Sequence, residues 1–376
     1  MSKYIFCFIL AAALLFISVF PTLSTDFKVI KNPKPNIIET EKQYVQLEKI
    51  KTIDANLENG INIFKPFSIS LSNDPDNVYI YDKLQAKIFI MDPELNMVKG
   101  TFGGEGFGPG ELGDKGKYGL IFIQMGRNGK LYAYSLLMRK IIVYDLNGKF
   151  IKDINNVEKG FWEPLVDVSG NIYDLTVEDR VIKAHNQENV SLFTLTQMED
   201  NFDFLFSTPD PRRVRKSSMQ PERWFFTALT VKSRFLLYFS SSSTMAIIEN
   251  NKISKQFRLW PKDVIQWHLV KLAAAKKRME SEKQYYDIFI PLFSSLFVDE
   301  SDDRTFFLQT RRYDDSMTQC LYQFNDNGQL VKVLYVKPGN IPGEEPPIID
   351  FKAKKNNRFY AVAEDKLILY RDPSEN

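Results

Sequence analysis

The feature that most constrains the fold of this chain is a pattern of short apolar strands that returns six times from residue 66 onward. The complete unit has an apolar strand, a polar turn, a second strand rich in aromatic and β-branched residues, a third strand, a tight turn and a more polar fourth strand, and the later copies match it more weakly. The clearest copies are residues 66–100 and 120–152. Four-strand repeats of about 40 to 50 residues are typical of propeller blades. The pattern therefore predicts an all-β repeat fold.

The turns within the copies support this assignment. Asn128-Gly129 and Asn147-Gly148 occupy two of them, and Asn-Gly is a strong hairpin signal because both central residues of such a turn need positive φ. Longer spacings between later copies are explained by two insertions. One is a basic loop at residues 198–221, and the other is a helix-like segment at residues 261–288 that starts near Pro261 and Asp263.

The last copy predicts how the ring closes. It has three strands and ends near the final residue, Asn376. The alternating segment Tyr44–Ile50 is a strand without a partner. Pairing it with the last copy removes an open sheet edge. We therefore expect residues 42–376 to form a six-bladed β-propeller with a helical insertion, closed by an N-terminal strand.

The first 24 residues have the features of a secretory signal peptide. Lys3 precedes an apolar run at residues 4–20, which Pro21 breaks, and small residues follow. The run is slightly shorter than the roughly 20 residues of a spanning helix. We expect export by a Sec-type signal to the periplasm or the outside. Cleavage is favoured, and an uncleaved anchor is left open as the one attachment to a membrane. Residues 25–41 are predicted to be a linker.

Several segments resemble a known repeat family. They are the glycine-rich stretch Phe102–Leu112, Asn128–Tyr132, Arg139–Phe150, Asn77–Asp82 and Lys87–Asp92. All resemble NHL-type repeats, with Asp82 at the family's aspartate and Ser135 in its place in the second copy. The chain is similar to secreted bacterial six-bladed β-propeller proteins with NHL-like blades. Many of those have no assigned activity, so the resemblance implies a fold and not a reaction.

The charge balance and the scarce reactive residues exclude several classes of function. With 49 basic and 47 acidic residues, the surface gives no reason to propose a nucleic-acid partner. Cys320 is the single cysteine outside the leader, which predicts a buried apolar role. Two histidines cannot form a three-histidine zinc site, and no G-x-S-x-G motif occurs. We therefore assign no catalytic residue, metal ligand or cofactor, and a carboxylate calcium site without particular residues is left open.

Two motifs that suggest ligands have simpler explanations. The glycine loop after Phe102 lacks the G-x-G-x-x-G spacing, so we interpret it as a crossover between blades that needs positive φ. The acidic turns at residues 74–76 and 299–303 do not match a calcium-binding loop, so we expect solvated hairpin turns there.

The insertions provide the candidate binding residues. A basic cluster at Arg212, Arg213, Arg215 and Lys216, with Arg223 and Trp224 nearby, could bind an anionic ligand or could be a solvated loop. Trp267 and His268 lie in the first half of the helical segment, which is either a lid or partner-binding helix or a helix packed on the rim.

The sequence thus favours a monomeric, exported, non-enzymatic binding or scaffolding protein. Its ligand would be a protein, peptide or glycan in the cell envelope, because a rigid repeat fold that displays variable loops suits recognition. The alternative is a metal-dependent lactonase- or lyase-like propeller enzyme with its site in the central channel. Convergence of carboxylates on the channel axis would favour this alternative.

Overall fold

The fold is taken from a computed structural model. It describes residues 28–30, 32, 44–53, 62–72, 76–115, 121–135, 137–155, 165–178, 181–185, 191–196, 225–229, 234–239, 244–249, 252–259, 293–302, 304–310, 319–336 and 349–375. These residues are strands and turns, and no helix occurs among them. The predicted signal peptide and both predicted insertions (residues 198–221 and 261–288) lie outside the described residues. Within the described ranges, no helix is long and apolar enough to cross a membrane.

The described strands pair into six sheets, which we number I to VI in chain order. Sheet I contains β4 (Pro66–Ser72), β5 (Asn77–Asp82), β6 (Lys87–Met91) and β7 (Val98–Gly103). Sheet II contains β8 (Ile121–Met125), β9 (Leu131–Ser135), β10 (Lys140–Tyr144) and β11 (Phe150–Ile154). Sheet III contains β12 (Leu165–Val166), β13 (Ile172–Glu178), β14 (Val181–His185) and β15 (Ser191–Thr196).

The last three sheets also take strands from the start of the chain. Sheet IV contains β16 (Phe225–Leu229), β17 (Phe235–Phe239), β18 (Thr244–Glu249), β19 (Lys252–Arg258) and β1 (Lys28–Val29). Sheet V contains β20 (Phe293–Val298), β21 (Thr305–Thr310), β22 (Gln319–Asn325), β23 (Leu330–Val336) and β2 (Tyr44–Gln46). Sheet VI contains β24 (Ile349–Lys355), β25 (Arg358–Ala363), β26 (Lys366–Arg371) and β3 (Glu48–Ile53).

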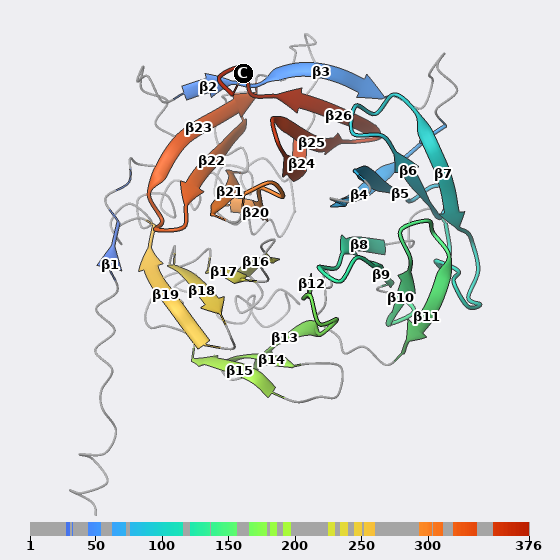
Figure 1. Cartoon of the computed structure of the whole chain (residues 1–376), viewed down its shortest axis with the longest axis horizontal. Helices are drawn as coiled ribbons and strands as arrows, with labels where there is room; N and C mark the ends of the chain where they lie inside the picture. Colours follow the sequence, from blue (N-terminus) through green and yellow to red (C-terminus); the bar gives the residue numbers. More distant parts are fainter. Residues whose placement is uncertain are drawn as a thin grey trace, which may run out of the picture.

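The sheets are arranged in a ring, which makes the fold a β-propeller and confirms the all-β propeller class (Figure 1). The first strand of each sheet lies nearest the centre and the fourth lies outside (Figure 1). Each inner strand contacts the next around the ring, and β24 contacts β4. Apolar side chains of neighbouring sheets form shared cores. The core between sheets I and II, for example, joins Tyr79 and Ile88 to Ile123 and Ile142.

Closure by an N-terminal strand is confirmed, with a shift in its position. β3 pairs antiparallel with β26, from Ile53 opposite Leu367 to Glu48 opposite Arg371. The predicted strand at residues 44–50 was therefore placed too early: its first part is β2, which pairs in parallel with β23 of sheet V. Within the predicted linker at residues 25–41, the short strand β1 pairs with β19. Two-residue strands have too little alternation to be recognised without their partners.

The glycine-rich stretch connects sheets I and II, as predicted. Gly103 ends β7 with φ of 78°, a conformation that glycine adopts without steric cost. The loop then folds on itself, since Gly113 N donates to Gly106 O at 2.7 Å. It docks on the next sheet through Lys140 Nζ, which donates to Gly108 O at 3.1 Å, and Tyr144 Oη, which donates to Gly110 O at 2.7 Å. These contacts support the crossover interpretation.

Candidate functional site: a charged mouth of the ring

Charged side chains gather where the inner strands end. Strands alternate in direction within each sheet, so the turns between first and second strands lie at the carboxyl ends of the inner strands. The ends of β20 and β24 run parallel, with Asp299 bridging to Lys354. Arg127, Asp299, Glu300, Lys354 and Lys355 all follow or end inner strands. We call the end of the ring formed by these five residues the charged mouth.

One ion pair at the charged mouth joins opposite sides of the ring. Arg127 follows β8 of sheet II and Glu300 follows β20 of sheet V, and two sheets separate II from V in either direction. The guanidinium binds both carboxylate oxygens, with Nη2 to Oε1 at 3.1 Å and Nη1 to Oε2 closer still. The side chains are only 7% and 13% exposed. The pair therefore crosses the central channel and is shielded from water.

A second ion pair holds the Glu300 turn in position. Lys354 Nζ binds Asp299 Oδ2, and these side chains are 3% and 6% exposed. Glu300 N donates to Lys354 O at 2.8 Å, and Asp299 Oδ1 accepts from Ser301 N at 2.9 Å. Sheets V and VI are thus joined at the turn that carries Glu300. The expectation of a solvated turn at residues 299–303 is wrong for Asp299, because a lysine from the next sheet pairs with it.

The same lysine-rich turn also reaches sheet I. Lys355 Nζ donates to Ser72 O at 2.8 Å and binds Asp76 Oδ1 at 2.5 Å. Asp76 keeps a 44% exposed side chain although Lys355 pairs with it, and residues 74 and 75 of the predicted solvated turn lie outside the described residues. Two adjacent lysines at the end of β24 thus link sheet VI to both of its neighbours.

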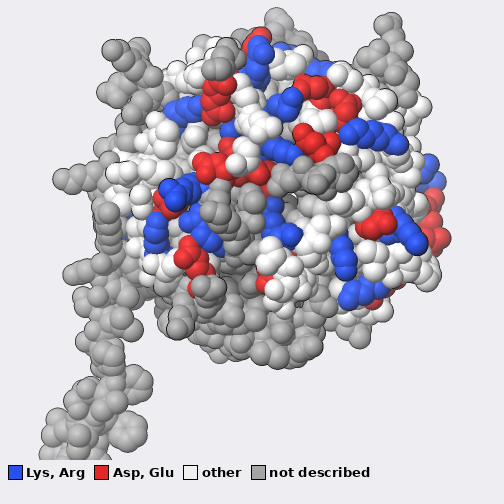
Figure 2. Space-filling model, in the orientation of Figure 1, with Lys and Arg blue, Asp and Glu red and all other residues white. Residues whose placement is uncertain are grey.

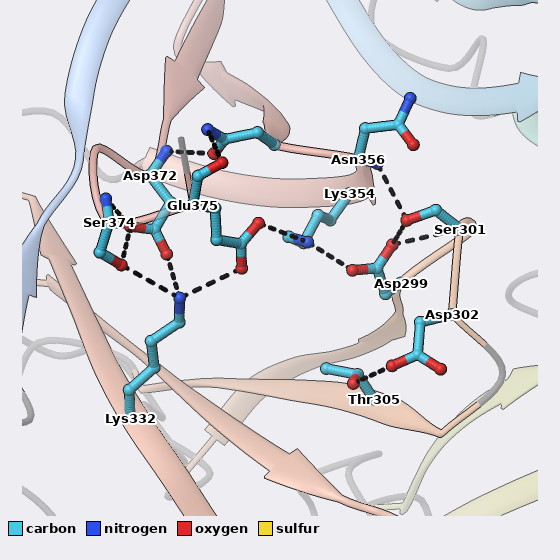
Figure 3. A network of polar contacts seen from close by, with 11 residues as sticks. Asp299, Ser301, Asp302, Thr305, Lys332, Lys354, Asn356, Asp372, Ser374 and Glu375 are labelled. Atoms are coloured by element: carbon cyan, nitrogen blue, oxygen red, sulfur yellow. Dashed lines mark hydrogen bonds and ion pairs between the residues drawn. The ribbon is translucent and has the colours of Figure 1, made fainter.

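The C-terminal tail extends the network outward (Figure 3). Lys332 of β23 binds Asp372, and its Nζ lies 3.1 Å from Glu375 Oε1 and 3.4 Å from Ser374 Oγ. Glu375 Oε2 lies 3.3 Å from Lys354 Nζ. Burial alone would raise the pKa of Asp372, but hydrogen bonds from Lys332 and Ser374 outweigh it and lower that pKa. Burial alone would lower the pKa of Lys332, but Asp372 and Glu375 outweigh it and raise that pKa.

Ion pairs connect the sheets at the charged mouth, and its third cation, Lys355, pairs with Asp76 of sheet I. The carboxylates of the charged mouth are bound by lysine or arginine, which leaves them poorly placed to hold a cation. No group of three side chains able to hold a metal occurs within the described part of the chain. Over the face seen in Figure 2, acidic and basic side chains are interleaved and do not form a patch of one sign.

The structure does not test the predicted site residues. Arg212, Arg213, Arg215, Lys216, Arg223, Trp224, Trp267 and His268 all lie outside the described residues. Cys320 is 4% exposed and lies in the core between sheets IV and V, which confirms its predicted apolar role.

Sequence reasoning missed Arg127, Glu300 and Lys354. The available signal was positional, since all three stand at or just after the end of a first strand in different copies.

The strands that flank the two predicted insertions meet them at the end of the ring opposite the charged mouth. Residues 197–224 join β15 to β16, and residues 260–292 join β19 to β20. Both segments lead into the amino end of an inner strand. Inner strands begin at the end opposite the charged mouth, so both connections enter the ring there.

No family model and no curated protein matches the chain. Among solved structures, the chain is similar to a Bacteroides fragilis protein described as exported. The two share 13% sequence identity with a TM-score of 0.48, and the match covers 92% of this chain and 98% of that one. A member of the DUF4221 family from Bacteroides vulgatus has 10% identity, a TM-score of 0.48 and coverage of 88% and 98%. A gluconolactonase from Xanthomonas campestris has 10% identity, a TM-score of 0.41 and coverage of 82% and 86%. Similarities at this level carry no argument about function, and the NHL-type resemblance stays a prediction.

Proposed function

We propose that the protein is an exported, monomeric, six-bladed propeller, one blade per sheet, that binds or scaffolds a protein, peptide or glycan in the cell envelope. The ligand would dock at the end of the ring opposite the charged mouth. The basic residues Arg212, Arg213, Arg215, Lys216 and Arg223, with Trp224, would supply contacts to an anionic ligand. Trp267 and His268 would belong to a second contact segment.

The observation that carries the proposal is the contrast between the two ends of the ring. One end is held by the Arg127–Glu300 pair across the channel, with its charges matched within the protein. The two longest connections, residues 197–224 and 260–292, enter inner strands at the other end. Connections on a rigid scaffold are where binding residues are usually placed. This favours recognition at that end over chemistry at the charged mouth.

The test compares two triple variants, each made in the protein without its predicted signal peptide (residues 25–376). Arg212→Ala, Arg213→Ala and Arg215→Ala remove three positive charges from the basic cluster. Lys87→Ala, Lys149→Ala and Lys152→Ala remove three from exposed strand and turn positions. Binding is measured to heparin, polygalacturonate and phosphatidylglycerol vesicles, and stability by thermal unfolding.

We expect the cluster variant to unfold at the same temperature as the wild type. Its affinity for the anionic probes should fall about tenfold or more, since charge-assisted hydrogen bonds are the strong ones. The lysine control should keep its affinity. Equal losses in both variants would mean unspecific attraction and would contradict the site. Tightly held calcium or zinc, together with lactone turnover that a chelator abolishes, would contradict the non-enzymatic function.

A further inference from the structure

The start of the chain contacts three sheets built from its second half. β1 pairs in parallel with β19, β2 in parallel with β23, and β3 antiparallel with β26. Figure 1 shows these three strands following the outside of the ring. Only β3 is needed to complete a four-stranded sheet, since sheets IV and V already have four strands each without β1 and β2.

Side chains of this segment enter three successive cores between sheets. Ile30, 7% exposed, lies in the core between sheets IV and V, and Tyr44 packs against it. Leu47, 4% exposed, lies in the core between sheets V and VI, where Val45 also packs. Ile53, 2% exposed, lies in the core between sheets VI and I. One short segment thus contributes apolar surface to half of the ring.

Asn32 joins two sheets through its side-chain amide. Its Nδ2 donates to Leu259 O of sheet IV and to Gly328 O of sheet V, both at 2.8 Å. Its Oδ1 accepts from Leu330 N at 2.9 Å. Ile30 N donates to Arg258 O at 2.9 Å, which continues the pairing with β19. An amide with both donors and its oxygen engaged holds these two sheets at a fixed separation.

We propose that the described residues 28–30, 32 and 44–47 act as a strap, distinct from the ring-closing strand β3, that holds sheets IV, V and VI together from outside. Release of the strap loosens the outer strands on that side of the ring and leaves sheets I and II intact. The outer strands β7 and β11 carry no fifth strand within the described residues, so they offer an internal comparison. Short edge strands open locally at lower free energy than the whole fold.

The test uses amide hydrogen exchange followed by mass spectrometry. The double variant Ile30→Ala/Asn32→Ala removes the buried side chain and the three amide hydrogen bonds. The matched control is Ile151→Ala on β11, an outer strand without a strap, where Ile151 is 41% exposed. We expect exchange in β19 and β23 to accelerate about tenfold while β7 and β11 stay within about twofold, as for local opening. Equal acceleration in all outer strands, or none, would overturn the strap.

The wild-type protein supplies a second measurement that does not depend on a variant folding. In rising urea below the unfolding transition, the amides of β1, Ile30, β2 and Leu47 should lose protection before those of β3. Simultaneous loss would show that the segment and β3 form a single unit, and the strap would then be rejected.

Discussion

At the scale of single residues, the buried Arg127–Glu300 ion pair should contribute measurably to the free energy of unfolding. A buried ion pair that loses one partner leaves an uncompensated charge, which costs about 3 to 5 kcal/mol. We expect Arg127→Met or Glu300→Gln to lower the free energy of unfolding by about 3 kcal/mol. In urea unfolding, the double-mutant cycle should give a coupling of about 2 kcal/mol.

The pair Arg371–Glu48 provides the control for this cycle. Its N–O distance is 2.7 Å, but the side chains are 46% and 50% exposed. Solvent screens such pairs, so its coupling should stay below about 1 kcal/mol. Equal coupling in the two cycles would mean that the cross-channel pair is not shielded as the structure indicates.

The Lys332–Asp372 pair should make the free energy of unfolding depend on pH in two ranges, one acidic and one alkaline. The lowered pKa of Asp372 stabilises the fold above the ordinary carboxyl pKa, and this contribution is lost as pH falls through the lowered value. The raised pKa of Lys332 stabilises the fold below the ordinary amine pKa, and this contribution is lost as pH rises through the raised value.

For the variant Asp372→Asn we expect a loss of about 3 kcal/mol at pH 7, because it leaves Lys332 with fewer partners. The difference from wild type should shrink as pH falls from about 4, where ordinary carboxyls take up protons, toward the lowered pKa of Asp372. Urea midpoints measured from pH 2 to pH 8 check this. A difference that does not change with pH would contradict a role for the carboxylate charge.

At the scale of an element, Gly103 at the end of β7 and Gly129 in the turn between β8 and β9 need glycine for different reasons. Gly103 has φ of 78°, and an added Cβ would lie 3.1 Å from Leu112 Cγ and nearer still to its Cδ1. Gly129, in the turn between β8 and β9, has φ of 72° but open space around it. Both substitutions carry backbone strain, while only the first also displaces a buried leucine.

We therefore expect Gly129→Ala to cost about 1 kcal/mol of unfolding free energy, the strain of an L-residue in the left-handed region. Gly103→Ala should cost about 2 to 3 kcal/mol, because overpacking adds to that strain. Chemical denaturation of the two variants checks the order. Similar costs would mean that the loop can move aside without loss.

At the scale of the whole molecule, ring closure depends on one face of β3. Ile53 is 2% exposed in the core between sheets VI and I, whereas Ile50 on the same strand is 43% exposed. Ile53→Asp would bury an unpaired charge at the closing seam, so we expect a loss of at least about 3 kcal/mol. Ile50→Asp should stay within about 0.5 kcal/mol.

Thermal unfolding of the Ile53 and Ile50 variants should give one transition each if the ring unfolds as a unit. A separate early transition for Ile53→Asp, with the remaining sheets intact, would show that closure is not coupled to the other sheets. Equal loss in the two variants would contradict the assigned face of β3.

The sequence by itself determined the class of fold. Alternating apolar strands, Asn-Gly turns and the return of one four-strand unit predicted a propeller whose last sheet borrows an N-terminal strand, and β3 on β26 confirms this. These signals are local, since each depends on spacing within a few residues. Cys320 and the glycine crossover were predicted on the same basis, from residue type and neighbouring strands.

Only the tertiary structure decided which distant residues meet. Arg127 and Glu300 are 173 positions apart, and nothing in either local segment indicates that the ring places them face to face. Asn32 contacts residues 227 and 296 positions away for the same reason. Composition and periodicity describe each sheet separately, while pairing across the channel and along the outer rim depends on how the six sheets are arranged around one axis.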